Sequence, residues 1–390
     1  MVLFNTVRAS LLSVLLSSAS VLEFNRAECQ RPTRNPLSGC PPNTILVGAG
    51  QRFTSVQQAV LSTGNSSTPY VILIQPGNYT EQVNVTRQAP LTLLGVTESP
   101  DDATQNQVNI IWHDATGNAV HDYDNAYTST LTVAPTFNAS ATGAGPDGDP
   151  VTPGTPLGDF DFRTYNLNFI NDYEPYSAGP SLAVSVSYAN ASFYYTQFLS
   201  YQDTVYIGKI GNAYMYDCII GGETDFFYGF GTLWVQNSDI KLRGCGGGIT
   251  AWKGTNTTYE NKYGVYIHNS HVAKANSSLN LTHKCALGRP WNPQMRAIFA
   301  FNYLDDSIIP SGYIEWQPTL PRIDFNTTMA EFHDYGPGFN LTGREEASNI
   351  TIEMTPWEYE PYSTPAKVFQ YPFSGEFGNV AWIDENPQTW

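Results

Sequence analysis

The sequence predicts an elongated all-β fold made of stacked turns of chain, and a parallel β-helix fits it best. Composition and a weak repeat support this prediction. Only 14% of the residues are charged, 13% are aromatic, and the chain contains 32 glycines, which is typical of β-rich proteins with many turns. The length of 390 residues exceeds that of a usual domain, but elongated β architectures reach this size as one unit.

The repeat runs through the middle of the chain and consists of short alternating segments. Its apolar anchors are Phe198, Ile220, Ile240 and Val272, separated by 22, 20 and 32 residues, and Phe169 begins the series 29 residues earlier. A small residue stands two places before each of the four anchors: Thr196, Cys218, Ser238 and Ser270. Periods of this length indicate a solenoid, in which the small residues form an inward column with a spacing of about 4.8 Å. The repeat alone leaves an ordinary β-sandwich with accidental spacing as the alternative.

The first 20 residues are typical of a secretory signal peptide. Arg8 precedes an apolar stretch, Ala9 to Ala19, that is too short to span a bilayer. Ser18 and Ser20 suit a cleavage site near residue 20. Eleven N-x-Ser/Thr sites follow, which indicates a glycoprotein: Asn65, Asn78, Asn84, Asn138, Asn190, Asn256, Asn276, Asn280, Asn326, Asn340 and Asn349. We therefore expect a secreted, extracellular protein, and no later segment is apolar enough to predict a membrane helix.

Charge and cysteine content narrow the possible partners and cofactors. The formal net charge of −16 argues against nucleic acid, because phosphate binding requires clustered Lys and Arg. Of the five cysteines, Cys29 and Cys40 are close enough for a local disulfide in an oxidising compartment. Cys245 and Cys285 are a candidate second pair, and Cys218 is expected to be a buried free thiol. The cysteine spacing fits no common zinc site.

The sequence after the signal peptide predicts a single domain. After the signal peptide we expect an irregular lead-in over residues 21–44 and a β-helix domain over residues 45–390. The segment from Phe53 to Leu61 is amphipathic and predicts a short helix. Residues 134–158 are rich in Gly, Pro, Ala, Thr and Asp, which predicts a long exposed loop. The Pro- and aromatic-rich residues 355–390 are expected to pack along the outside of the main body.

Two aspartates and one arginine are the candidates for chemistry. Asp203 and Asp225 are 22 residues apart, which matches one turn of the predicted helix, so the carboxyl groups are expected to stack on adjacent coils. Two adjacent carboxylates resist double ionisation, which separates an acid from a nucleophile. A nearby arginine such as Arg289 keeps its closest partner ionised. Taken singly, an aspartate in a β protein is more often a turn residue or a solvated charge.

Several collinear segments between about residues 45 and 340 resemble the signatures of the pectinesterase family, the pectin methylesterases. These segments are FTSVQQAV at 53–60, GNYTE at 77–81, YQDTVY at 201–206, GETDFFYG at 222–229, ITA at 249–251, LGRPW at 287–291, GYIEW at 312–316, AEF at 330–332 and GPG at 336–338. The chain resembles a fungal-like secreted member without an inhibitor-like pro-domain. The resemblance implies a right-handed, single-stranded parallel β-helix that removes the C6 methyl esters of galacturonate in pectin and releases methanol.

By position, the resemblance also implies residue roles. Asp225 attacks the ester carbonyl, and Asp203 protonates the departing methanol and then takes a proton from water. Arg289 holds Asp225, and Gln202 donates to the oxyanion. The aromatic residues expected to line the groove and bind sugar rings are Trp291, Tyr206, Tyr228 and Phe226. The resemblance implies pectin as the partner, no metal or organic cofactor, and a monomer.

One departure concerns Leu182. The family usually has a second oxyanion glutamine about 22 residues before Gln202, where this chain has Leu182. Losing one oxyanion donor costs about 10²–10³ in rate in other enzymes. A catalytically weak or inactive pectin-binding protein is therefore the alternative function. Pectin lyase or polygalacturonase activity is a further alternative, but the sequence shows neither an acidic calcium-binding cluster nor several closely grouped aspartates.

Overall fold

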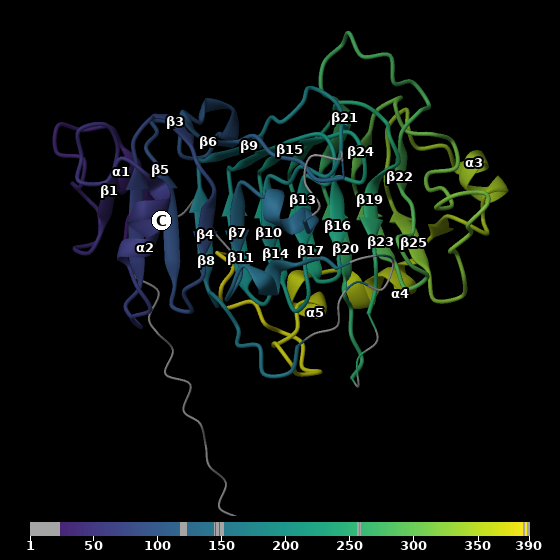
Figure 1. The fold of residues 1–390 in the computed structure, drawn as a ribbon. Coiled ribbons are helices and arrows are strands. Elements are labelled where there is room, and N and C mark those ends of the chain that lie inside the picture. Colours follow the sequence, from purple (N-terminus) through teal and green to yellow (C-terminus); the bar gives the residue numbers. More distant parts are fainter. Residues whose placement is uncertain are drawn as a thin grey trace, which may run out of the picture.

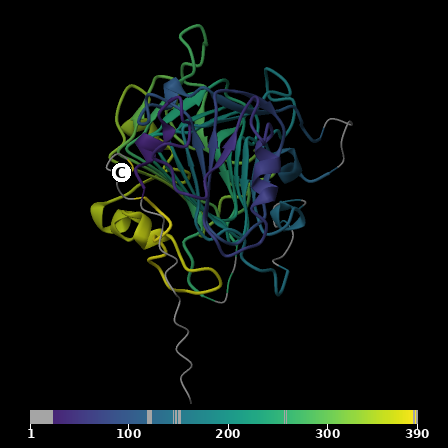
Figure 2. The same cartoon turned by 90° about the vertical axis from the view of Figure 1, so that its left-hand side faces the viewer.

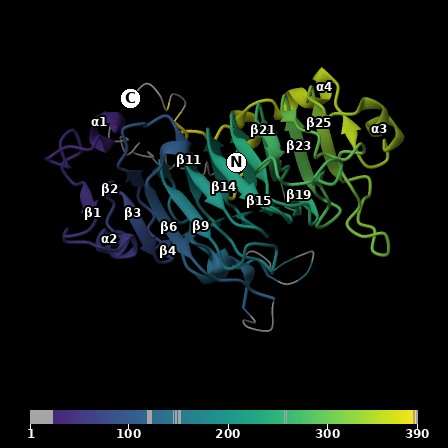
Figure 3. The ribbon, with the colours of Figure 1, turned by 90° about the horizontal axis from the view of Figure 1, so that it is seen from above.

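The computed structural model describes residues 24–117, 123–143, 145, 148, 152–255, 257, 259–384 and 387. The predicted signal peptide, residues 1–20, lies outside this part of the chain. Three parallel sheets, which we name A, B and C, run side by side along the molecule, and between residues 70 and 288 each coil contributes a strand to A, then to B, then to C. Figure 1 shows sheet C toward the viewer, and Figure 3 shows the coils following one another from the end near α1 (Arg26–Gln30) to the end near α3 (Leu341–Glu346).

Within the described residues, sheet A has eleven strands, sheet B eight and sheet C seven. Sheet A contains β1 (Ile45–Val47), β2 (Tyr70–Ile74), β5 (Leu91–Gly95), β8 (Phe162–Tyr165), β11 (Asn190–Tyr194), β14 (Asn212–Tyr216), β17 (Thr232–Gln236), β20 (Gly264–His268), β23 (Arg296–Ala300), β25 (Thr328–Phe332) and β26 (Ile352–Glu353). Sheet B contains β3 (Gly77–Thr80), β6 (Val108–Trp112), β9 (Asn168–Asn171), β12 (Gln197–Leu199), β15 (Ile219–Gly222), β18 (Asp239–Leu242), β21 (His271–Lys274) and β24 (Tyr303–Leu304).

Sheet C completes each coil, and the helices lie outside the three sheets. Sheet C contains β4 (Val83–Val85), β7 (Leu131–Val133), β10 (Val184–Val186), β13 (Val205–Ile207), β16 (Phe227–Gly229), β19 (Gly248–Trp252) and β22 (Ala286–Gly288). The α-helices are α1 (Arg26–Gln30), α2 (Val56–Ser62), α3 (Leu341–Glu346), α4 (Pro356–Tyr359) and α5 (Pro365–Val368). The 3₁₀ turns are η1 (Ala103–Gln105), η2 (Asn125–Thr128), η3 (Asn138–Ser140) and η4 (Glu360–Tyr362).

The corner between sheets A and B is built the same way in successive coils. One residue with a left-handed φ of 46° to 61° turns the chain in each: Asn166, Tyr195, Asp217, Asn237, Asn269, Phe301 and His333. At four of these corners the next residue is small: Thr196, Cys218, Ser238 and Ser270. The backbone N–H of one coil donates to the hydroxyl of the next, with Cys218 N donating to Ser238 Oγ (3.0 Å) and Ser238 N donating to Ser270 Oγ (3.1 Å). The predicted inward column of small residues is confirmed, and it also satisfies buried backbone donors.

The interior of the β-helix is filled by the apolar anchors of the repeat. Phe169 and Phe198 stack from coil to coil with ring centroids 5.7 Å apart, and Ile220, Ile240 and Val272 continue the row, all fully buried. Apolar residues stacked at strand spacing exclude water from the core, and this burial is the main stabilising contribution to such a fold.

A second apolar cluster lies outside sheet A. Tyr165, Tyr194 and Trp234 project outward from the sheet and are covered by Phe369 and Trp382 of the C-terminal segment. Figure 2 shows this segment, in yellow, along one side of the stack of coils. The prediction that residues 355–390 pack along the outside is therefore confirmed for the described residues. Without this segment, the aromatic face of sheet A would be exposed to water.

The N-terminal residues cover one end of the molecule. Helix α2 begins at Val56, close to the predicted start, and the Ser55 hydroxyl accepts from Gln58 N at 3.1 Å. The carboxylate of Glu81 also accepts the N–H groups of Val56 (2.7 Å) and Gln57 (2.9 Å). A negative group that binds the first N–H groups stabilises the start of a helix.

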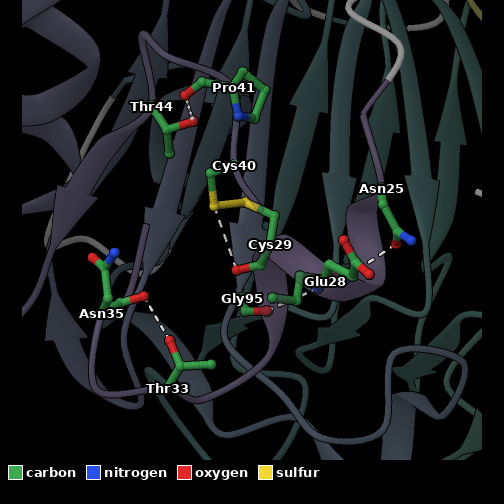
Figure 4. Close-up of a disulfide and its surroundings, with 10 residues drawn as sticks. Asn25, Glu28, Cys29, Thr33, Asn35, Cys40, Pro41, Thr44 and Gly95 are labelled. Atoms are coloured by element: carbon green, nitrogen blue, oxygen red, sulfur yellow. Dashed lines mark hydrogen bonds between the residues drawn. A yellow bond between two sulfur atoms is a disulfide. The ribbon is translucent and has the colours of Figure 1, made fainter. Parts of the chain in front are cut away.

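The lead-in is less irregular than predicted, because it contains helix α1. The Asn25 side chain caps α1 by accepting from Glu28 N at 3.1 Å, and a disulfide joins Cys29 to Cys40 beside it (Figure 4). A cap and a crosslink together hold this short helix in place. No helix among the described residues is long and apolar enough to cross a membrane.

The cysteine predictions are confirmed. Besides the bond between Cys29 and Cys40, Cys245 and Cys285 form a disulfide, and Cys218 is free and buried. Burial raises the pKa of the Cys218 thiol to about 12, so the reactive thiolate is scarce at neutral pH.

We predict that Cys218 resists a thiol reagent in the native protein and reacts only on unfolding. The measurement is mass spectrometry of the alkylated protein at pH 8 with and without denaturant. The Cys218→Ser variant, which has no free thiol in the described residues, is the control. Rapid labelling of the native wild-type protein would contradict the burial of this side chain.

Candidate active site

Asp203 and Asp225 occupy equivalent corners of adjacent coils, between sheets B and C. Val205 pairs with Phe227 in the parallel register of β13 and β16, which places the two aspartates side by side. Asp203 N donates to Thr224 O (3.1 Å), and Asp225 N donates to Gly248 O (2.8 Å). Both aspartates have a left-handed φ, 61° and 48°. Residues of this backbone type are strained and often lie at functional sites.

Arg289 reaches back from the end of β22 to Asp225. Its Nε and Nη2 donate to Asp225 Oδ1 (3.0 Å) and Oδ2 (2.7 Å), while Gly248 N donates to Oδ1 at 3.0 Å. The Arg289 side chain passes close to Gly247 on its way to Asp225. A Cβ at Gly247 would lie 2.6 Å from Asp225 Oδ1 and 2.9 Å from Arg289 Nη2. The bidentate ion pair holds Asp225 as an oriented carboxylate.

The electrostatic environment of Asp203 disfavours a negative charge, in contrast to that of Asp225. It is 7% exposed, and burial raises its pKa well above the usual value, with the negative Asp225 adding to the rise and Arg289 opposing it. Burial and the neighbouring charge thus favour the protonated form of Asp203, while two hydrogen bonds from Arg289 orient Asp225. This is the arrangement expected when one group donates a proton and the other acts as a nucleophile.

Two side-chain amides lie at this pair. Gln202 directly precedes Asp203, is partly exposed, and its amide makes no hydrogen bond to the described protein residues. Asn125, at the start of η2, places Nδ2 3.5 Å from Asp203 Oδ2. Leu182 is fully buried in an apolar cluster with Ala126 on the outer face of sheet C, so its side chain supplies no donor.

Three of the predicted groove aromatics are not accessible. Tyr206 and Tyr228 are 0% and 1% exposed, and Phe226 is fully buried in the interior core. The expected contact of these three rings with sugar is therefore corrected: they support the site from beneath. Tyr206 and Tyr228 point outward from sheet C, but Leu182 and neighbouring residues cover them.

Trp291 is the predicted aromatic residue that stays partly exposed. It lies after β22, and its ring packs on Tyr228 with centroids 5.4 Å apart. The buried ammonium of Lys253 lies 3.4 Å from the centroid of the Trp291 ring and donates to Gly145 O at 2.9 Å. A cation against one side of an aromatic ring holds the ring in place and leaves the exposed part of Trp291 for a ligand.

Sequence reasoning assigned no role to Trp316, Asn125 or Gly247, although all three lie at the site. The Trp316 ring contacts two guanidinium groups, with Arg289 Cζ at 4.2 Å and Arg322 Cζ at 4.1 Å from its centroid. Trp316 was visible in the GYIEW segment. Asn125 and Gly247 carried no sequence signal, because each lies in an irregular segment whose path only the tertiary structure sets.

The raised pKa of Asp203 predicts a gain in stability when this acid is neutralised. A carboxyl group whose folded pKa lies above its unfolded value stabilises the fold at low pH and loses that contribution as pH rises through the folded pKa. Asp203→Asn should therefore melt higher than wild type at pH 7, where 1 kcal/mol corresponds to roughly 2 °C for a large chain, and the difference should vanish below about pH 4.

Thermal melts between pH 3.5 and 8 test this expectation. Glu345→Gln, at an exposed side chain of helix α3, is the control and should show no such pH-dependent gain. An Asp203→Asn variant that melts below wild type at neutral pH would contradict the raised pKa.

Comparison with known proteins agrees with this geometry. A probable pectinesterase A from Neosartorya fischeri is 28% identical over 326 residues, covering 82% of this chain and 86% of that protein. The pectin methylesterase of Aspergillus niger superposes with a TM-score of 0.65 at 23% identity, covering 89% and 98% of the two chains. A pectin methylesterase solved with a hexasaccharide gives 0.62 at 21% identity, covering 85% and 98%. These similarities confirm the right-handed parallel β-helix.

The family model of pectinesterase matches residues 158–369. This range is more than half of the chain, and it contains Asp203, Asp225 and Arg289. The chain therefore belongs to the pectinesterase family.

Proposed function

We propose that this protein is a secreted pectin methylesterase that hydrolyses the C6 methyl esters of galacturonate and releases methanol. The observation that carries the proposal is the pairing of a buried acid with an arginine-bound carboxylate. Asp203 has a raised pKa, while Arg289 donates twice to Asp225. Family membership and a pectin methylesterase structure that holds a hexasaccharide support pectin as the substrate.

In the first half of the reaction, Asp225 acts as the nucleophile. One carboxylate oxygen attacks the ester carbonyl carbon, and the carbonyl electron pair moves onto its oxygen, with Gln202 as a donor to that oxyanion. When the oxyanion collapses, the bond to the methoxy group breaks, and Asp203 gives its proton to the departing methanol. The buried, protonated state of Asp203 suits this step.

In the second half, Asp203 changes role. Once it has lost its proton, it takes one from a water molecule that attacks the acyl group on Asp225. The tetrahedral intermediate collapses, the bond to Asp225 breaks, and the product leaves as galacturonic acid, which loses its proton to solvent, so both aspartates return to their starting states. Because Arg289 keeps its two hydrogen bonds to Asp225, the leaving carboxylate is stabilised in the same position from which it attacked.

Several features support an extracellular location. The signal-like residues 1–20, the eleven glycosylation sites and the two disulfides all suit an oxidising compartment. The domain boundaries, 21–44 and 45–390, and a monomeric state stay predictions.

The buried Leu182 favours one competing function, a pectin-binding protein with little or no catalysis. The two functions differ in products, because only an esterase releases methanol and leaves the chain length of pectin unchanged. Methanol assays and viscometry on highly methylated pectin distinguish these functions, and a fall in viscosity would indicate a lyase or hydrolase of the backbone.

We predict that Asp225→Ala and Asp225→Asn both reduce methanol release to below a few per cent of wild type. Both variants lack the attacking carboxylate, and the asparagine preserves the side-chain volume beside Arg289. Methanol release at saturating pectin, with circular dichroism to confirm folding, is the measurement. Asp239→Ala is the control, and substantial turnover by either Asp225 variant would exclude this nucleophile.

Gly247→Ala should also damage catalysis although it removes no functional group. The new Cβ would lie within 3.0 Å of both Asp225 and Arg289, so the ion pair must shift. We expect turnover to fall by about 10-fold or more, because small misplacements of reacting groups cost up to about 100-fold. Wild-type turnover in a folded Gly247→Ala enzyme would show that this geometry is not required.

A further inference from the structure

An amide from outside the family-like segments lies beside the catalytic acid. Asn125 Nδ2 is 3.5 Å from Asp203 Oδ2, at the long limit for a hydrogen bond. Asp203 therefore binds this amide only weakly, and the amide is available to a stronger acceptor. The acceptor that appears during the proposed reaction is the oxyanion, which carries a full negative charge.

The turn that carries Asn125 is firmly anchored. The Asp124 carboxylate accepts from Ala126 N (3.0 Å), Thr142 N (2.8 Å) and Gly143 N (2.8 Å). These bonds tie η2 to the segment that follows β7. Figure 1 shows short helical turns of this region, in blue, in front of strands β10 and β13 of sheet C. A donor on a rigid turn keeps its position during a reaction.

Leu182 supports this turn from below. The Thr128 hydroxyl donates to Asn125 O (2.8 Å) and accepts from Leu182 N (3.0 Å), so one hydroxyl links the two residues. The Leu182 side chain packs in the same apolar cluster as Ala126 of η2. Leu182, whose side chain supplies no donor, therefore helps to position the turn η2 that carries the Asn125 amide.

We propose that Asn125 is a second oxyanion donor beside Gln202, and that Leu182 is the positioning residue that holds it. The proposal rests on the proposed esterase function. As Asp225 Oδ bonds to the ester carbon, the carbonyl electron pair moves onto oxygen, and Asn125 N–H donates to that oxygen. When the pair returns and the methoxy bond breaks, methanol leaves with the proton of Asp203, and the amide is unchanged.

The first test is the pair of variants Asn125→Ala and Asn125→Asp. Both lose the N–H donor, and the aspartate preserves the size of the side chain. We expect kcat on methylated pectin to fall about 100-fold in each, as when an oxyanion donor is removed elsewhere, with KM changed little. Asn109→Ala is the control: this half-buried amide also donates to one side-chain oxygen, Asn78 Oδ1 at 2.8 Å, but on sheet B, and it should retain wild-type kcat.

The second test is a double-mutant cycle between Leu182 and Asn125. Leu182→Ala should lower kcat in the wild type, because the turn loses its support, but should change kcat little when Asn125 is already alanine. Thermal melts of each variant show whether the folded state persists. Equal effects of Leu182→Ala in both backgrounds would show that Leu182 does not act through Asn125.

The outcomes separate this inference from the proposed function. A wild-type protein that releases no methanol from any methylated pectin refutes the function. An active wild type whose Asn125→Ala variant retains kcat refutes only the oxyanion role. Asn125→Ala could instead shift the part of the pH dependence of kcat that Asp203 controls and leave the maximal kcat near wild type. The amide would then act on the acid rather than on the oxyanion, and the inference would also be wrong.

Discussion

Parallel register between neighbouring coils is the constraint on which the site depends. Val205 lies opposite Phe227 in sheet C, and the same offset of 22 residues brings Asp203 beside Asp225. A slip of one residue would turn an inward side chain outward, because side chains alternate along a strand. The polar column from Cys218 to Ser270 holds this register through hydrogen bonds between coils.

The register places the two carboxyl groups side by side. Because two adjacent carboxylates repel each other, their environments must differ. Arg289 binds one carboxylate twice, whereas the other is buried with few partners and has a raised pKa. The second environment weakens the fold at neutral pH, since the unfolded chain gains free energy by ionising this carboxyl group while the native state keeps it protonated. The Trp316 ring lies against the guanidinium groups of both Arg289 and Arg322, and it restrains the one that orients Asp225.

The outer face of sheet C shows how an irregular segment changes a site on a regular scaffold. Residues after β6 form η2 and η3 over strands whose outward side chains are Tyr206 and Tyr228, and both rings are buried. Leu182 belongs to the same apolar cluster as these rings, so a polar glutamine would lie among apolar neighbours at that place, at a cost in desolvation. Leu182 is therefore explained by its apolar surroundings, and its presence does not by itself indicate a loss of catalytic activity.

The sequence by itself determined the β-helix, the inward column of small residues, the disulfide between Cys29 and Cys40, and the adjacency of Asp203 and Asp225. The column and the adjacency follow from local spacing, because the central coils measure 22 and 20 residues and the side-chain period of a strand is two. The β-helix itself also rested on the family resemblance, since the repeat alone left a β-sandwich open, and the disulfide followed from the short separation of its two cysteines. Tertiary structure alone decided that Tyr206 and Tyr228 are buried, that Trp316 braces Arg289, and that Asn125 reaches Asp203. Asn125 is 78 residues from Asp203 along the chain; its position depends on how an irregular segment folds back over a sheet, and no periodic pattern records that path.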